Sequence, residues 1–407
     1  MRFKANSLKK VLVVILVDAL FVLYFTLGAS AAGYKAGDAV KFGSYPQSSV
    51  TDEKLISDLN SLSLSWISYN YYYGSTHGED GEMQPGNFMR YADTEYNGKK
   101  YRAVIADAYR PYETTGRAST EESASETYKL GTVYWFSYEP VEWIVLDADS
   151  GLVLSKLILD AQPFNNYSIM NPDKYNKETG SNFLCFLGNS DMTYYASDYV
   201  NSSVRKWLTT DFFETTFSED ENADILTSTL DNTGYHTLNS YIGAEELDFE
   251  PTDDKVFLLS YADLYTGDIF SAETDTEKLK RHYFDGDSSI FDEAVGTDYA
   301  EIQGLRKNEN KESASYGLSS WSLRTALNSR GICSVGGDAH IETVRTDSAG
   351  IRPAMKISLD SKNIIVGDSG RSATSDKSLY VAIVTGAVLV AGGIIAGVIN
   401  SKRKKNK

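Results

Sequence analysis

An uninterrupted apolar run near the carboxyl end constrains the fold of this chain more than any other feature. Residues 379–399 read LYVAIVTGAVLVAGGIIAGVI without a charged side chain, and the basic sequence SKRKKNK follows directly. As a helix the run would be about 31 Å long, which matches the hydrocarbon core of a lipid bilayer. The sequence therefore predicts a transmembrane helix at 379–399 and, by the positive-inside rule, a basic cytoplasmic tail at 400–407.

The first 32 residues have the pattern of a secretory signal peptide. Lysine and arginine side chains precede an apolar stretch at 11–27, and Ala29-Ser30-Ala31 supplies the small residues that signal peptidase reads. An uncleaved first transmembrane helix is the alternative interpretation. Both place the central part of the chain outside the cell. We expect cleavage and therefore a single-pass protein of the cell membrane with an extracellular main domain, whereas the uncleaved chain would be a two-pass hairpin.

The charge and composition of the remaining chain exclude some partners. The net charge of the whole chain is −17 even with its two basic ends, which argues against nucleic acid and against a surface that adheres to anionic lipid. We expect an N-terminal strand-rich segment with an insertion at 33–130, a main extracellular domain at 131–359 and a polar tether at 360–378. Aromatic residues make up 12% of the chain, which is typical of strands and also suits recognition of flat ligands.

The chain contains two cysteines, Cys185 and Cys333. In an oxidising compartment they could form a disulfide across a long loop. The alternative is a pair of buried thiols, because both lie in apolar segments that are typical of a protein core.

Local patterns predict antiparallel strands with a few short helices, an α+β fold. We expect a strand at 34–47 that a turn ends at Tyr45-Pro46, a type I′ hairpin at Asn97-Gly98, and three successive strands at 131–140, 141–151 and 152–159. A helix is expected at 202–217, because its apolar residues recur on one face, followed by a capping box at 218–221. An antiparallel run is expected from 320 to 359.

Several phrases, in order, resemble a family of bacterial exported proteins known as domain of unknown function 6273. They include KFGSYPQ at 41–47, YEPVEWIVL at 138–146, VRKWLTTDFF at 204–213 and GIRPAMKISL at 350–359. The ending of the family is similar to that of C-type-lectin-like and formylglycine-generating-enzyme-like domains, which implies a C-type-lectin-like fold. The enzyme role is not implied, because that site needs a closely spaced cysteine pair and this chain has none.

No catalytic motif occurs, and the four histidines stand singly without metal-ligand spacing. We therefore expect no cofactor and no metal, and favour a non-enzyme. An aromatic residue with hydrogen-bonding groups near a C-terminal hairpin suits recognition of a sugar or a peptide. The candidate ligand-binding residues are Trp321, Arg324, Asp338, His340 and Arg352. In the alternative interpretation, Trp321 packs in the core and Arg352 forms an internal ion pair.

Small residues recur in the expected membrane anchor, which runs from Leu379 to Ile399. Gly386, Gly393 and Gly397 would let two such helices approach closely, which favours self-association; an ordinary glycine-tolerant anchor is the alternative. We therefore expect a membrane-anchored cell-surface protein whose outer domain binds a carbohydrate or a protein. The alternative is an exported enzyme that acts on cell-wall or glycan material.

Overall fold

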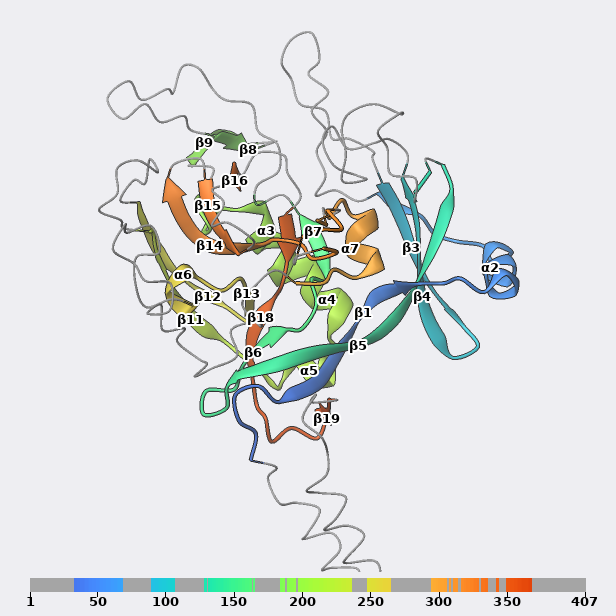
Figure 1. Cartoon of the computed structure of the whole chain (residues 1–407), viewed down its shortest axis with the longest axis horizontal. Helices are drawn as coiled ribbons and strands as arrows, with labels where there is room; N and C mark the ends of the chain where they lie inside the picture. The colour runs from blue at the N-terminus through green and yellow to red at the C-terminus, as the bar shows by residue number, and fades with distance from the viewer. Residues whose placement is uncertain are drawn as a thin grey trace, which may run out of the picture. The chain divides into compact units, whose positions relative to one another are not determined.

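A long antiparallel pair of strands, β1 (Ala39–Ser49) and β5 (Val133–Asp147), runs through the centre of the main sheet (Figure 1). β1 follows one edge of β5 over most of its length. Along the other edge, β4 pairs with the first half of β5 and β6 pairs with its second half. Because β5 has 15 residues, it joins two groups of strands that would otherwise be separate.

The computed structural model describes a defined part of the chain. These residues are 33–68, 89–106, 128–129, 131–162, 164, 184–186, 189–194, 197–235, 247–264, 294–305, 307–308, 310–313, 316–328, 331–335, 342–343 and 349–367. Those up to Val366 belong to one compact unit.

Two sheets and two hairpins make up the β structure. The other strands of the main sheet are β2 (Ile67–Ser68), β3 (Met89–Tyr96), β4 (Lys99–Ala106), β6 (Leu152–Ser155), β10 (Ile225–Leu226), β13 (Val256–Phe257), β18 (Ala354–Ile357) and β19 (Ile365–Val366). The second sheet has the order β16 (Glu342–Thr343), β15 (Gly331–Val335), β14 (Trp321–Asn328), β17 (Ala349–Ile351), β7 (Asp160–Gln162). The hairpins pair β8 (Leu184–Phe186) with β9 (Asn189–Tyr194), and β11 (Ser228–Thr233) with β12 (Asp248–Asp254).

The described helices are short. They are α2 (Glu53–Asn60), α3 (Ser203–Trp207), α4 (Phe213–Thr216), α5 (Glu219–Asn222), α6 (Tyr261–Leu264) and α7 (Asp298–Ile302), and the π-helical segment η2 (Leu208–Phe212) joins α3 to α4. The continuous stretch from α3 to α4 buries Val204, Trp207 and Phe212 on one face, as the apolar spacing predicts. The main core lies where this stretch packs against the central strands; there Trp143 is fully buried and its Nε1 donates to the Phe42 carbonyl oxygen at 2.8 Å.

A second, smaller core lies under α2. It contains Leu59 from α2, Ala92 from β3, Tyr101 and Ala103 from β4, and Trp135 from β5. Alternate residues of β4 therefore face two different cores. Both faces of this part of the sheet are covered, which explains why the second half of β4 is buried without alternation.

The strongest local signals predicted the structure correctly. Asn97 and Gly98 form the two-residue turn between β3 and β4 with φ of 52° and 74°, the positive values that a type I′ turn requires. Ser218 and Glu221 form the expected capping box at the start of α5. Both features depend only on neighbouring residues, and both are confirmed.

Two expected strand boundaries and one expected strand direction are wrong. β1 continues through Tyr45-Pro46 to Ser49, and the two strands expected at 131–140 and 141–151 are the single strand β5. Pro140 does not interrupt β5 because it lies opposite Ser44, beside a bulge in β1, where a missing ladder hydrogen bond is tolerated. The run from 320 to 359 is also not wholly antiparallel, because β14 and β17 are parallel.

The predicted fold class is corrected as well. In place of an α+β fold, the described residues form a mostly β structure, in which the longest single α-helix has eight residues. The physical reason is that most apolar segments pair as strands, and tertiary packing leaves only short helices between them.

The predicted transmembrane helix is a further correction. Among the residues that the structure describes, no helix is long and apolar enough to cross a membrane, which contradicts the single-pass protein of the cell surface expected from the sequence. A membrane span needs about 20 helical residues, far more than the described helices contain. The segments that motivated the prediction, 1–32 and 379–399, lie outside the described residues.

The turn between β5 and β6 predicts a large effect of one added methyl group. Gly151 has a φ of +71°, and a Cβ atom there would lie 2.0 Å from the Ile357 carbonyl oxygen of β18. Gly98 has a similar φ, but a Cβ atom there would meet nothing within 4 Å. We expect Gly98→Ala to lower the free energy of unfolding by about 1–2 kcal/mol through backbone strain alone. Gly151→Ala should cost more than about 3 kcal/mol, because β18 must also shift. Urea denaturation of both variants measures this difference, and equal losses would contradict the close approach of β18.

Candidate ligand-binding site

Two of the ligand-binding candidates from the sequence lie deep in the core. Trp321 is fully buried, and Arg352 is 2% exposed with its guanidinium 4.8 Å from the centre of the Trp321 ring. Arg352 donates to the carbonyl oxygens of Ser155 and Lys156 at 3.0 and 3.4 Å. Desolvation lowers the pKa of Arg352 to about 9, so the group stays charged at neutral pH. This pair joins β14 to the loop between β17 and β18, away from the surface.

Arg324 is also an interior residue. Its guanidinium donates to the Leu258 carbonyl oxygen at 2.8 Å and to Asp263 Oδ2 at 2.7 Å, and reaches the Asp231 carbonyl oxygen at 3.3 Å. The side chain is 5% exposed. Arg324 therefore connects β14 to β11, to the residue that follows β13, and to α6. In each of these contacts its guanidinium donates to a protein group and not to solvent.

The remaining candidates give less information. Asp338 and His340 lie outside the described residues, as do Leu379, Gly386, Gly393, Gly397 and Ile399. Cys185 lies in β8, and Cys333 is a free, buried thiol on β15. The thiol is 8% exposed, and desolvation raises its pKa to about 12.

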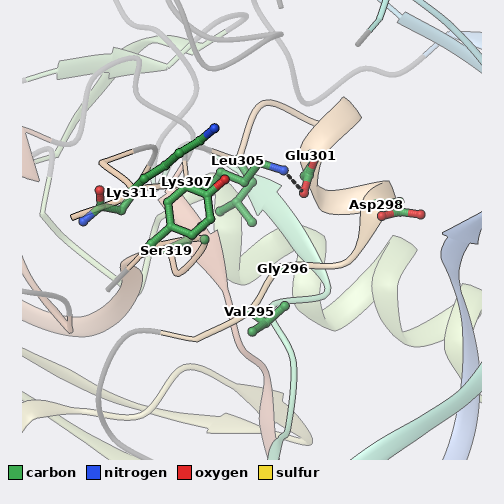
Figure 2. A pocket seen from close by; sticks show the side chains of 11 residues that line it. Val295, Gly296, Asp298, Glu301, Leu305, Lys307, Lys311 and Ser319 are labelled. Carbon is green, nitrogen blue, oxygen red and sulfur yellow. Dashed lines mark hydrogen bonds and ion pairs between the residues drawn. The ribbon is translucent and has the colours of Figure 1, made fainter. Parts of the chain in front are cut away.

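A pocket of about 560 Å³ lies beside α7 (Figure 2). Its volume is within the range of sites that hold small molecules. Its lining residues come from α7 and the loops on either side of it: Val295, Gly296, Asp298, Glu301, Leu305, Lys307, Asn308, Lys311, Tyr316, Gly317 and Ser319. All of these described lining residues lie between 294 and 319.

The start of α7 is fixed by its cap and by the preceding loop. Thr297 is the N-cap, and its Oγ1 accepts from the Ala300 amide at 3.0 Å. The loop before α7 forms two backbone hydrogen bonds with Ile158. The Ile158 amide donates to the Val295 carbonyl oxygen, and the Thr297 amide donates to the Ile158 carbonyl oxygen. A side chain at Gly296 would collide with Leu305, since its Cβ would lie 2.1 Å from Leu305 Cδ2.

The inner face of α7 is anchored by Tyr299, which is fully buried. The Tyr299 ring makes edge contacts with Tyr45 of β1 and Phe136 of β5, at centroid distances of 5.6 and 5.4 Å. Its hydroxyl accepts a hydrogen bond from Arg102 Nη1 at 3.1 Å. The helix is therefore joined to three strands through one side chain.

Arg102 itself is buried, with 3% of its side chain exposed, and pairs with Asp93 of β3 through two parallel hydrogen bonds of 2.8 Å. The guanidinium also lies 4.4 Å from the centre of the Tyr91 ring. Desolvation raises the pKa of Asp93, but the hydrogen bonds and charge of Arg102 outweigh it and hold that pKa below its usual value. The ion pair thus stays charged in the folded protein.

Two carboxylate residues of α7 line the pocket. Asp298 Oδ2 accepts from the Ser49 amide at 2.8 Å, and Glu301 Oε1 pairs with Lys307 Nζ at 2.8 Å. Figure 2 shows Glu301 directed toward Lys307, whereas the Asp298 carboxylate points away from the other labelled side chains. Each carboxylate therefore keeps an oxygen atom that these contacts leave available.

The opposite wall of the pocket contains an aromatic side chain and a buried hydroxyl. Tyr316 is 52% exposed and Val295 is 50% exposed, whereas Ser319 is 3% exposed. Ser319 is held by a two-way backbone bridge with Ala294, at 2.9 and 3.0 Å. An aromatic face, two carboxylates, lysine ammonium groups and a hydroxyl are the groups that orient a polar ligand by stacking and hydrogen bonding.

The sequence did not reveal this pocket. Residues 261–315 carry many charges and little periodicity, so the sequence pattern indicates no regular element and no site there. The available signal was Thr297-Asp298, an N-cap residue followed by an acidic first turn, which predicts a helix start. No group of three or more histidine, cysteine, aspartate or glutamate side chains is placed to hold a metal within the described ranges.

Comparison with known proteins gives one match. The family model described as "Domain of unknown function (DUF6273)" matches residues 151–359, about half of the chain. No curated protein matches, and no solved structure does, so the similarity to C-type-lectin-like domains stays a prediction. The matched range contains the whole pocket and α7, while β1, β4 and the ion pair beneath α7 lie before it.

The buried ion pair predicts unequal effects of two substitutions. Asp93→Ala would leave the Arg102 guanidinium charged and buried without its carboxylate, so we expect the free energy of unfolding to fall by about 3 kcal/mol or more. Lys156→Ala, which breaks the exposed pair with Glu142, should change it by less than about 1 kcal/mol. Chemical denaturation measures both values. Similar small effects would mean that the Arg102–Asp93 pair does not support the fold.

The environment of Cys333 predicts slow alkylation. Because the thiol is buried and its pKa is raised to about 12, it is almost entirely protonated at pH 8.5, and iodoacetamide reacts with the thiolate. We expect mass spectrometry to find Cys333 unmodified in the folded protein and modified in urea. Rapid labelling without urea, or a disulfide-linked Cys185–Cys333 peptide, would contradict a buried free thiol.

Proposed function

The chain belongs to the family described as domain of unknown function 6273, and we propose that its β domain is a binding module that holds a carbohydrate in the pocket beside α7. The observation that carries the proposal is the exposed Tyr316 ring in a pocket with Asp298, Glu301 and Lys307. Sugars are recognised by stacking of their apolar face on an aromatic ring and by hydrogen bonds to their hydroxyl groups. This pocket offers both kinds of group on one short segment.

The support beneath the pocket favours binding by a preformed site. α7 is fixed by the Thr297 cap, by the Tyr299 ring and by the Arg102 hydrogen bond to that ring's hydroxyl. A rigid helix keeps Asp298 and Glu301 at a constant separation, so little conformational entropy is lost when a ligand binds. A site placed on such a supported element is better suited to recognition than a loop without core contacts.

The size of the pocket favours a small ligand over a protein partner. A volume of about 560 Å³ accommodates a few sugar rings. A stable protein–protein interface instead needs roughly 800 Å² of surface on each partner. The size of the pocket therefore favours a carbohydrate over a protein, the two ligand classes that the sequence suggests.

Titration with oligosaccharides tests this function. We expect binding of an oligosaccharide identified on a glycan array, measured by isothermal titration calorimetry, to weaken at least about 10-fold in Tyr316→Ala because the stacking surface is lost. Ile67→Ala is the matched control, since Ile67 of β2 is 51% exposed, lies outside the pocket, and should leave the affinity unchanged.

A reducing-end assay on the bound oligosaccharide separates a binding module from an enzyme. We expect no release of reducing sugar during prolonged incubation. Turnover that is lost in Glu301→Gln would instead identify an enzyme that acts on glycans. Equal binding by Tyr316→Ala and the unmodified protein, or no binding on the array, would contradict the proposed site.

A further inference from the structure

Ser319 has a hydroxyl group that its surroundings do not use. Its Oγ has no hydrogen-bond partner among the described residues, although the residue is 3% exposed and lines the pocket. The backbone is fully occupied, because both its amide and its carbonyl pair with Ala294. Buried hydroxyl groups are normally hydrogen-bonded, so an unused one at a pocket wall points to a partner that binds there.

The Ser319 Oγ atom is itself buried in the structure, so it can meet a ligand only after rotation about χ1. Serine has three staggered χ1 positions, and rotation of the buried Oγ breaks no hydrogen bond because it makes none in its present position. The backbone bridge to Ala294 holds the Cα atom in place during this rotation. A hydroxyl is both a donor and an acceptor, so it suits a neutral ligand group with the same ability.

The charges of the pocket point to the same ligand class. Its described lining contains two carboxylates, Asp298 and Glu301, and two ammonium groups, Lys307 and Lys311. Glu301 and Lys307 neutralise each other at 2.8 Å (Figure 2). The four charges sum to zero, so the pocket gives neither an anionic nor a cationic ligand a net attraction, whereas a neutral polyhydroxylated ligand can donate to the carboxylates and accept from the ammonium groups.

We propose that the pocket selects a neutral sugar and that one hydroxyl of this sugar forms a hydrogen bond with Ser319 Oγ. This inference rests on the proposed carbohydrate-binding function and adds the ligand class and the residue that distinguishes it. Ser319 acts together with Tyr316: the ring supplies the stacking surface, and the serine hydroxyl fixes the orientation of the stacked sugar.

Matched β-1,4-linked trisaccharides test the ligand class in the full chain. Cellotriose and chitotriose are neutral, the deacetylated chitosan trimer is cationic, and the cellotriuronic acid trimer is anionic. We expect calorimetric titration to give a Kd for at least one neutral trimer that is at least about 10-fold lower than the Kd of either charged trimer. A charged trimer that binds as tightly as the neutral ones overturns the selection of a neutral ligand, and the carbohydrate-binding function then stands.

Two serine variants test the role of the hydroxyl. Ser319→Ala should weaken binding of the neutral trimer by about 2- to 10-fold, the effect of one neutral hydrogen bond. Ser322→Ala is the control, because Ser322 is 1% exposed, its Oγ also has no partner among the described residues, and it lies outside the pocket lining. The affinity of the Ser322→Ala variant for the neutral trimer should equal that of the unmodified protein.

The outcomes separate the two levels of the proposal. If Tyr316→Ala weakens binding and Ser319→Ala does not, the pocket binds a sugar and the assignment of Ser319 is overturned. If both serine variants bind equally weakly, the effect comes from the core and the assignment is also overturned. If none of the four trimers binds, the selection of a neutral sugar is overturned. The proposed carbohydrate-binding function is then also overturned for β-1,4-linked trisaccharides.

Discussion

The buried Arg102 guanidinium is the interaction on which the arrangement of this protein depends. It lies on β4, pairs with Asp93 on β3, and donates to the Tyr299 hydroxyl on α7. A charge with 3% of its side chain exposed is stable only with this complete set of partners, because desolvation of an unpaired cation is costly. The hairpin that precedes the family match therefore contributes a buried hydrogen bond to the helix beside the pocket.

The structure uses its cations and aromatic rings in two ways. In the interior, Arg352 lies over Trp321 and Arg102 lies over Tyr91, so guanidinium groups and rings satisfy each other away from solvent. At the pocket, Tyr316 is half exposed and Lys307 pairs with a carboxylate at the surface. Aromatic and charged residues are common to both settings, and burial alone separates structural groups from groups that can meet a ligand.

Local features of the fold were predictable from the sequence, and features that depend on tertiary contacts were not. The Asn97-Gly98 turn and the Ser218–Glu221 capping box follow from adjacent residues. The continuity of β5 through Pro140 depends on a bulge in a strand roughly 100 residues away, which no local pattern shows. The same limit applies to Trp321, because its burial depends on contacts such as the one with Arg352 from another segment. Segment hydropathy likewise predicted a membrane helix that the described structure does not contain.

The most direct measurement is a crystal structure of the protein with a bound neutral trisaccharide. The account predicts one sugar ring stacked on Tyr316, with hydroxyl groups within hydrogen-bond distance of Ser319 Oγ and of Asp298 or Glu301, and α7 in the same position as without ligand. A trisaccharide bound at another surface, or α7 displaced from the Arg102–Tyr299 contact when the pocket is occupied, would contradict it.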